Sequence, residues 1–240
     1  EATARELELE HPGLSTRTFH CDLSHAGDVA ELMRRVRTEL PRVDVWAHVS
    51  SLEARKGDLG EGLWDDGERL VQAEVRALAR LSHAWLGPMI ERRRGGLLWF
   101  GSAGATLPNA EAPLRAAAQG FMDGLAESLR VRLVGTGVTL TEVLAGPTTT
   151  EVLGAVGQGR APMPLSRWAL SPEELTAEGL SGYLSGRAQL TPGFGLRQTL
   201  RALSLLPGPL KRMVFGLATL RQRSAQREPF ASGIPRPLLH

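Results

Sequence analysis

The sequence predicts an α/β fold, a doubly wound parallel sheet with helices on both faces. Short apolar runs typical of buried strands alternate with longer segments whose apolar residues recur every three or four positions. This alternation favours parallel strands joined by right-handed helical crossovers, which place helices on both faces of the sheet. The chain has 240 residues, 42% of them hydrophobic, which suffices for one core of this kind.

The first quarter of the chain predicts two helices, two strands and a charged loop. His11-Pro12-Gly13 ends the first helix, because proline and glycine interrupt regular structure. A run rich in Thr and Phe then predicts a strand, and apolar residues at steps of three and four predict the second helix. We predict helices at residues 4–10 and 26–40, strands at 14–21 and 43–50, and a loop at 52–62.

The rest of the chain continues the alternation of helix and strand. Gly135-Thr136-Gly137 predicts a turn, and Ser171 is well suited to cap a helix whose first turn holds Pro172 and two glutamates. We predict helices at residues 64–92, at 114–133 and after 171, strands at 97–101, 138–144 and 189–190, and a small-residue loop at 102–113.

Composition excludes several classes of function. The formal net charge is only +2 and the arginines are scattered, so we expect no nucleic-acid partner. A single cysteine, Cys21, rules out a disulfide framework within the chain, and the six histidines lack metal-ligand spacing, so we expect no metal. No apolar run reaches the roughly 18 residues that span a bilayer. We therefore expect a cytoplasmic protein, with association at a membrane surface as the alternative.

Three local motifs resemble the short-chain dehydrogenase/reductase family. The run VDVWAHVSS (43–51) stands where the family has its fourth strand and an Asn-Asn-Ala-Gly turn. LLWFGSAG (97–104) is similar to the strand that ends in Ser-Ser-x-Ala-Gly, and VLAGPTTTEV (143–152) to the Pro-Gly-Pro-x-x-Thr loop. The resemblance covers about residues 4–195 and implies a Rossmann-like fold with its first βαβ portion missing. It also implies an NAD(P)(H)-dependent oxidoreductase that acts on a hydroxyl or carbonyl group.

The resemblance also implies where NAD or NADP would bind. It places Asp22 near the adenine ring, and it places Gly146, Pro147 and Thr150 over the nicotinamide. The Gly-rich loop that normally binds the pyrophosphate has no counterpart before the first predicted helices. Either the sequence, which begins at Glu1, is a fragment, or the protein cannot hold a dinucleotide in the usual way; Glu1 in place of Met favours the fragment.

The family's catalytic residues are replaced in this sequence. The Asn, Ser, Tyr and Lys positions fall on Glu74, Gly101, Leu114 and Ala118. A tuned phenol normally exchanges the proton with the carbonyl oxygen, and none of the four substitutes supplies one. Ser102, next to Gly101, is the candidate for a surviving substrate contact.

Other polar residues have a structural interpretation that we prefer. His48 is expected to be a strand-end histidine, with a cleft residue as the alternative. Tyr183, the only tyrosine, is expected in a late helix and not as a displaced acid. If a cleft survives, we expect it at the carboxyl ends of the strands, around Ser102, Ala103 and Gly146.

The sequence predicts two segments and leaves several functions open. Residues 1–195 form the predicted domain, and 196–240 a Leu/Arg-rich extension that packs on it, as we favour, or lies on a membrane surface. The protein is then an oxidoreductase for a small carbonyl or alcohol substrate of lipidic kind, either impaired or active through a displaced proton relay such as solvent or Glu74. The alternatives are a non-catalytic binding or partner subunit and a damaged gene product. The resemblance implies a homodimer or tetramer formed through the two long helices.

Overall fold

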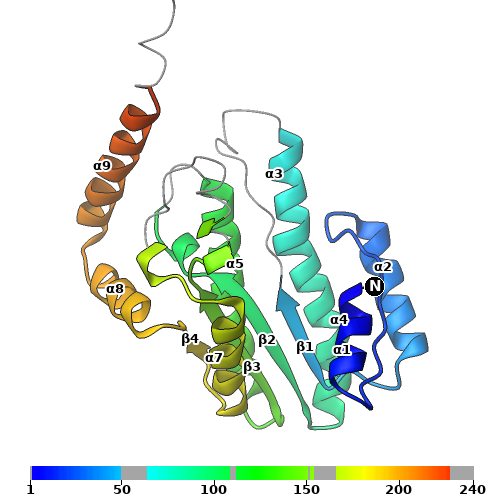
Figure 1. The fold of residues 1–240 in the computed structure, drawn as a ribbon. Coiled ribbons are helices and arrows are strands. Elements are labelled where there is room, and N and C mark those ends of the chain that lie inside the picture. Colours follow the sequence, from blue (N-terminus) through cyan, green and yellow to red (C-terminus); the bar gives the residue numbers. More distant parts are fainter. Residues whose placement is uncertain (1, 50–63, 109–111, 151, 154–165, 228–240) are drawn as a thin grey trace, which may run out of the picture.

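Four parallel strands form one sheet in the order β1-β2-β3-β4. They are β1 (Val45–Val49), β2 (Gly95–Ser102), β3 (Val138–Ala145) and β4 (Gln189–Leu190). The protein is seen here in a computed structural model that describes residues 2–49, 64–108, 112–150, 152–153 and 166–227 (Figure 1). The predicted loop at 52–62 lies outside the described residues. The predicted parallel α/β fold is confirmed.

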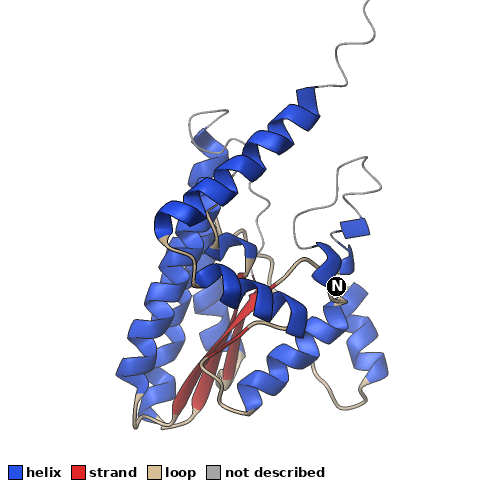
Figure 2. Ribbon diagram, turned by 90° about the vertical axis from the view of Figure 1, so that its left-hand side faces the viewer, coloured by secondary structure: helices blue, strands red, loops and turns tan. Residues whose placement is uncertain are grey.

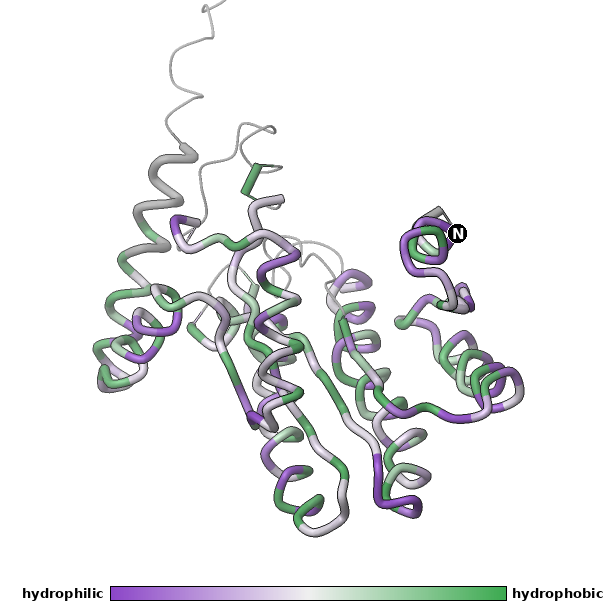
Figure 3. The backbone as a smooth tube through the Cα atoms, turned by 60° about the horizontal axis from the view of Figure 1, so that its bottom comes forward, coloured by the Kyte–Doolittle hydropathy of each residue, from purple (hydrophilic) through white to green (hydrophobic). Residues whose placement is uncertain are grey.

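Helices cover both faces of this sheet because residues on each strand alternate in direction (Figure 2). Leu97 and Trp99 point toward α2 (Ala26–Glu39), α4 (Leu78–Glu91) and α5 (Pro113–Leu133), where the largest apolar cluster lies. Leu98 and Phe100 point to the opposite face, where they meet α7 (Pro172–Leu184). Hydrophobic and hydrophilic residues alternate around α2, as expected for a helix with one buried side (Figure 3).

The long helix predicted at 64–92 is one continuous helix with a π-helical stretch in its middle. It consists of α3 (Trp64–Val71), a π-helical stretch (Gln72–Ala77) and α4. Such a widened turn shifts the register of the following helix and is common at functional sites. Here it contains Glu74, the residue to which the resemblance assigns the family's Asn position.

The crossover from β3 to β4 is not right-handed, although we expected right-handed crossovers throughout the sheet. From β1 to β2 to β3 the chain moves across the sheet in one direction, with α4 and α5 on the same face. From β3 to β4 it moves in that direction again, but α7 packs on the other face. The third crossover therefore has the opposite hand to the first two. Residues 166–170, which lead into α7, lie at the carboxyl edge of the sheet, where Leu170 pairs with Thr148.

The prediction of a strand at residues 14–21 is wrong. These residues follow α1 (Ala2–Glu10) in an extended but irregular course and pair with no strand of the described chain. A strand is stabilised by the hydrogen bonds of a neighbour, and composition alone cannot supply that neighbour. Thr16 instead donates its backbone and hydroxyl hydrogens to the Glu8 carboxylate, at 2.7 Å each.

The predicted turns and caps are confirmed. Gly135 and Gly137 have φ angles of 77° and 79°, and a side chain on Gly137 would collide with the Arg93 carbonyl. Ser171 accepts a hydrogen bond from the Glu174 backbone at 3.1 Å, and the Glu174 carboxylate accepts one from the Ser171 backbone at 2.9 Å.

The C-terminal segment forms two helices with different surroundings. The first, α8 (Phe194–Ser204), inserts Leu196, only 1% exposed, between Ala103 and Leu144 at the carboxyl edge of the sheet. The second, α9 (Gly208–Arg227), runs away from the sheet in both ribbon views (Figures 1 and 2). None of the helices in the described part of the chain combines the length and the apolar character that crossing a bilayer requires.

Candidate active site

The carboxyl ends of β2 and β3 bring the candidate residues together. Ser102 is paired with Ala145 in the sheet, and the Ala103 backbone continues the contact by donating to the Ala145 carbonyl at 2.8 Å. Gly146 and Pro147 follow directly. The sequence-based expectation of a shared edge is met, because parallel strands end on the same side of their sheet.

The four positions assigned to catalysis come from three elements that pack together. Glu74 lies in the π-helical stretch, Gly101 near the end of β2, and Leu114 and Ala118 on α5. Ala118 is buried and Leu114 is half-buried, so both belong to the packing between α5 and the sheet. Neither carries an ionisable group.

A buried glutamine side chain, that of Gln119, lies beside Gly101, the residue to which the resemblance assigns the family's serine position. The side chain of Gln119 lies against the Cα of Gly101, and its Oε1 would be 2.5 Å from any Cβ at that position. The same oxygen accepts a hydrogen bond from the Ser102 backbone N–H at 2.7 Å. A serine at 101 would therefore collide with Gln119 in this arrangement, and the serine position cannot hold a hydroxyl without moving that amide.

Gln119 also connects this edge to two carboxyl groups, those of the half-buried Asp123 and the buried Glu142. Its amide nitrogen donates to Asp123 at 2.6 Å and to Glu142 at 3.3 Å. Glu142 is fully buried in β3, and its other oxygen accepts from Gln189 at 3.0 Å and from Arg130 at 3.4 Å.

The surroundings of Glu142 shift its ionisation. Burial, together with the hydrogen bond and negative charge of Asp123, raises the pKa of Glu142 from 4.5 to about 7, although Gln189 and Arg130 act in the opposite direction. Glu142 therefore keeps its proton up to near neutral pH. Sequence reasoning missed the network of Gln119, Asp123, Arg130 and Glu142. The available signal was a glutamate in the middle of an otherwise apolar strand.

His48 is buried at the carboxyl end of β1, as the preferred interpretation predicted. Its ring packs edge-on against Trp46 with the centroids 5.4 Å apart, and its Nε2 has no hydrogen-bond partner among the described residues. Burial lowers the pKa of His48, and the Glu74 carboxylate partly opposes that shift. His48 and Glu74 are thus electrostatic neighbours beside the candidate site.

The residues assigned to the nicotinamide side are occupied by contacts within the chain. A Cβ on Gly146 would collide with Leu196 of α8, so this glycine permits close helix packing. Pro147 accepts a backbone hydrogen bond from Leu170 at 3.3 Å. The hydroxyl of Thr150 is exposed and lies 3.1 Å from that of Thr148.

Asp22, assigned to the adenine side, closes a local turn. Its carboxylate accepts two hydrogen bonds from Ser24, at 2.9 and 2.7 Å, and faces His25 and Arg69 at 3.2 and 3.5 Å. The bonds from Ser24 are the main reason that the pKa of Asp22 falls to about 2. A polar hollow of about 330 Å³ lies beside it, between the start of α2 and α3.

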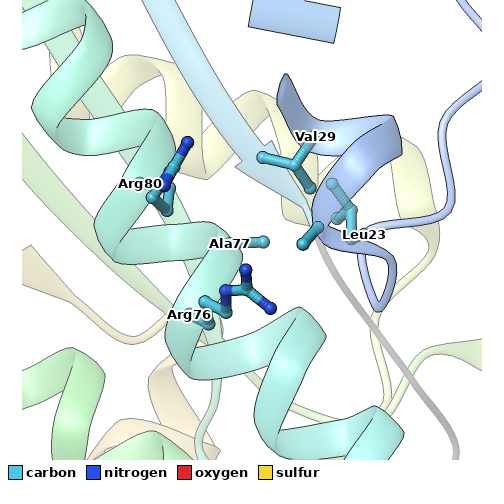
Figure 4. Close-up of a pocket in the computed structure, with 6 residues that line it drawn as sticks. Leu23, Val29, Arg76, Ala77 and Arg80 are labelled. Atoms are coloured by element: carbon cyan, nitrogen blue, oxygen red, sulfur yellow. The ribbon is translucent and has the colours of Figure 1, made fainter. Parts of the chain in front are cut away.

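A much smaller apolar hollow lies between α2 and the long helix. Leu23 and Val29 line one side of it and Ala77 the other, with Arg76 and Arg80 at its rim (Figure 4). Its volume of about 10 Å³ holds no more than a water molecule. This hollow is therefore a packing gap and not a ligand site.

Tyr183 lies at the opposite end of the sheet from the candidate site. Its ring packs on Leu98, Val143 and Leu190, and its hydroxyl lies against the Cα of Gly96 near the amino end of β2. Lys211 is in α9 and donates to the Ser204 carbonyl at 2.9 Å. The placement of Tyr183 agrees with the expectation that it is not a displaced acid. The chain's other lysine, Lys56, lies outside the described residues.

Comparison with known proteins gives a consistent result. The family described as short chain dehydrogenase matches residues 1–161. An uncharacterized oxidoreductase of Myxococcus xanthus is 29% identical over 203 residues, which cover 85% of this chain and 78% of that protein. An uncharacterized short-chain type dehydrogenase/reductase of Sinorhizobium fredii is 26% identical over 62% of this chain and 60% of its own length. The match thus leaves a substantial part of each relative uncovered.

Solved structures show the same fold. A short-chain dehydrogenase from Sphingobium yanoikuyae in complex with NADPH superposes with a TM-score of 0.69, at 22% identity over 98% of this chain and 84% of that one. A 7β-hydroxysteroid dehydrogenase gives a TM-score of 0.75, at 19% identity over 90% and 81% of the two chains.

Proposed function

Because this chain belongs to the short-chain dehydrogenase family, we propose that it is an oxidoreductase-type protein whose hydride-transfer chemistry is impaired. The observation that carries the proposal is the Gln119 amide, which fills the space beside Gly101 where the resemblance places a hydroxyl. A proton source for the carbonyl oxygen is also missing at the assigned positions, because Leu114 and Ala118 supply neither a phenol nor an ammonium group.

The residues at the carboxyl edge do not fit a nicotinamide dinucleotide as they stand. Leu196 packs on Gly146, and the Asp22 carboxylate is already hydrogen-bonded to Ser24. The Sphingobium relative is described in complex with NADPH, which supports NAD(P) as the ancestral cofactor of this site. We propose that any affinity of this chain for NAD(P) is weak.

Two measurements on the 240-residue chain test this proposal. The first is binding of NADPH and NADH by fluorescence, and the second is their turnover with small and lipidic ketones and alcohols. We expect weak binding and no turnover. Turnover that is abolished by Glu74→Gln and kept by the control Glu91→Gln, at the far end of the same helix, would reveal a displaced proton relay and refute the proposal.

Restoring the family's residues tests whether activity is absent because of the site residues or because of the rest of the fold. In one variant, Glu74→Asn, Gly101→Ser, Leu114→Tyr and Ala118→Lys restore the family residues, and Gln119→Ala makes room for the serine. We expect this variant to gain turnover only if the dinucleotide also binds. A matched variant that keeps Gln119 should fold less stably, because the serine and the amide then compete for one space.

A further inference from the structure

The C-terminal helix α9 presents an apolar stripe that the rest of the fold does not cover. Leu210, Met213, Val214 and Leu217 recur at helical spacing, so they lie on one side of the helix. All four are exposed, Met213 and Leu217 by 56% and 54%. The helix α9 runs away from the sheet (Figures 1 and 2), and the exposure of these four side chains shows that they lie outside the domain core.

The connection to the domain explains this position. Leu196 and Leu200 of α8 pack with Trp168 and Leu144 at the carboxyl edge of the sheet, which fixes α8 in place. Pro207 and Gly208 then interrupt the helix, and α9 starts in a new direction. The segment therefore consists of a docked helix followed by a projecting one.

Charge is distributed very unevenly between this segment and the rest of the chain. Residues 194–227 contain seven basic residues and no acidic one. Since the whole chain has 28 basic and 26 acidic residues, the remainder carries 21 basic against 26 acidic. The helix pair is thus a strongly positive element attached to a negative domain. The basic residues are Arg197, Arg201, Lys211, Arg212, Arg221, Arg223 and Arg227.

From this combination we propose that α9 binds the surface of an anionic lipid bilayer, with its apolar stripe in the interface and its basic side chains near the headgroups. Basic residues beside an exposed Leu/Met/Val face are what an interfacial helix requires. The negative domain would be repelled by the same surface, so only the helix pair would face the lipid. This association is peripheral, and it is independent of the activity proposed above.

Two other occupants fit less well. A second copy of α9 would bring another basic helix against the first, and like charges at that contact would oppose pairing. Nucleic acid would satisfy the positive charge but leave the apolar stripe exposed to water. Anionic lipid satisfies both the charge and the stripe.

Co-sedimentation with vesicles tests the proposal on the 240-residue chain. We expect it to bind vesicles of phosphatidylcholine with about one third phosphatidylserine, and to bind pure phosphatidylcholine at least about tenfold more weakly. Binding should weaken further at high salt, because the electrostatic part is screened.

Two pairs of variants separate the apolar contribution from the charge contribution. Met213→Asp with Leu217→Asp should lower binding at least about tenfold on both vesicle types, and its control is Leu180→Asp with Leu184→Asp, two leucines of α7 that are 47% and 74% exposed. Lys211→Glu with Arg212→Glu should lower binding about tenfold on the anionic vesicles, with Arg94→Glu and Arg132→Glu as the matched charge control.

Three outcomes would overturn the proposal. One is an absence of binding to either vesicle type by the wild-type chain. Another is equal weakening by the control variants, which would assign binding to overall charge. The third is a concentration-dependent dimer that the Met213/Leu217 variant dissociates while vesicle binding is absent, which would assign the stripe to a second copy.

Discussion

Replacing Glu142 by glutamine should remove a specific pH dependence of stability. Glu142 is fully buried between Asp123, Arg130 and Gln189, and its pKa in the folded protein is raised from 4.5 to about 7. Between these two values the folded state holds a proton that the unfolded state has released. The free energy of unfolding therefore falls as pH rises through this window, and the loss is complete above the folded pKa.

The size of this effect follows from the two pKa values. Each pH unit between them corresponds to about 1.4 kcal/mol, so the wild-type protein should lose about 3 kcal/mol through this one group between pH 4.5 and 8. Glutamine has nearly the same shape and can still accept from Gln189 and Arg130. Glu142→Gln should therefore match the wild type near pH 4.5 and exceed its stability by about 3 kcal/mol at pH 8.

Urea unfolding followed by tryptophan fluorescence measures this difference. Trp99 is the register partner of Glu142 in β2, so its emission reports directly on this part of the core. The control is Glu127→Gln, because Glu127 also binds Arg130 but is 72% exposed. If Glu142→Gln and the wild type change in parallel from pH 4.5 to 8, the assigned proton is not on Glu142.

Three further predictions concern packing, capping and protonation. Gly101→Ser should destabilise the protein by about 1–3 kcal/mol through its collision with Gln119, and adding Gln119→Ala should recover part of this loss in urea unfolding. Ser171→Ala should cost about 1 kcal/mol by removing the cap of α7, seen as a lower Tm, whereas Ser171→Asp should be nearly neutral. His48→Phe should remove a loss of stability below pH 6.5, because burial lowers the pKa of His48 and the unfolded chain binds the proton first; unchanged acid sensitivity in circular dichroism would count against this assignment.

Local sequence patterns determined most of the elements of this protein. The apolar periods placed α2, α4, α5 and the strands within a few residues of their observed bounds. The glycines at 135 and 137 and the cap at Ser171 determined where elements turn or begin, because their geometry depends only on neighbouring residues. The motifs at the strand ends also identified the family, whereas the assignment of Glu74, Gly101, Leu114 and Ala118 to its catalytic positions stays a prediction.

Only the tertiary structure decided the features that depend on distant partners. Residues 14–21 have strand composition but pair with no strand in the described part of the chain, and the last crossover changes hand because α7 packs on the other face of the sheet. The placement of Gln119 beside Gly101, and that of Asp123 beside the buried Glu142, arise where α5 meets the sheet. Such contacts join residues far apart in the chain, and local sequence carries no information about which side chain fills a shared space or how far water is excluded from it.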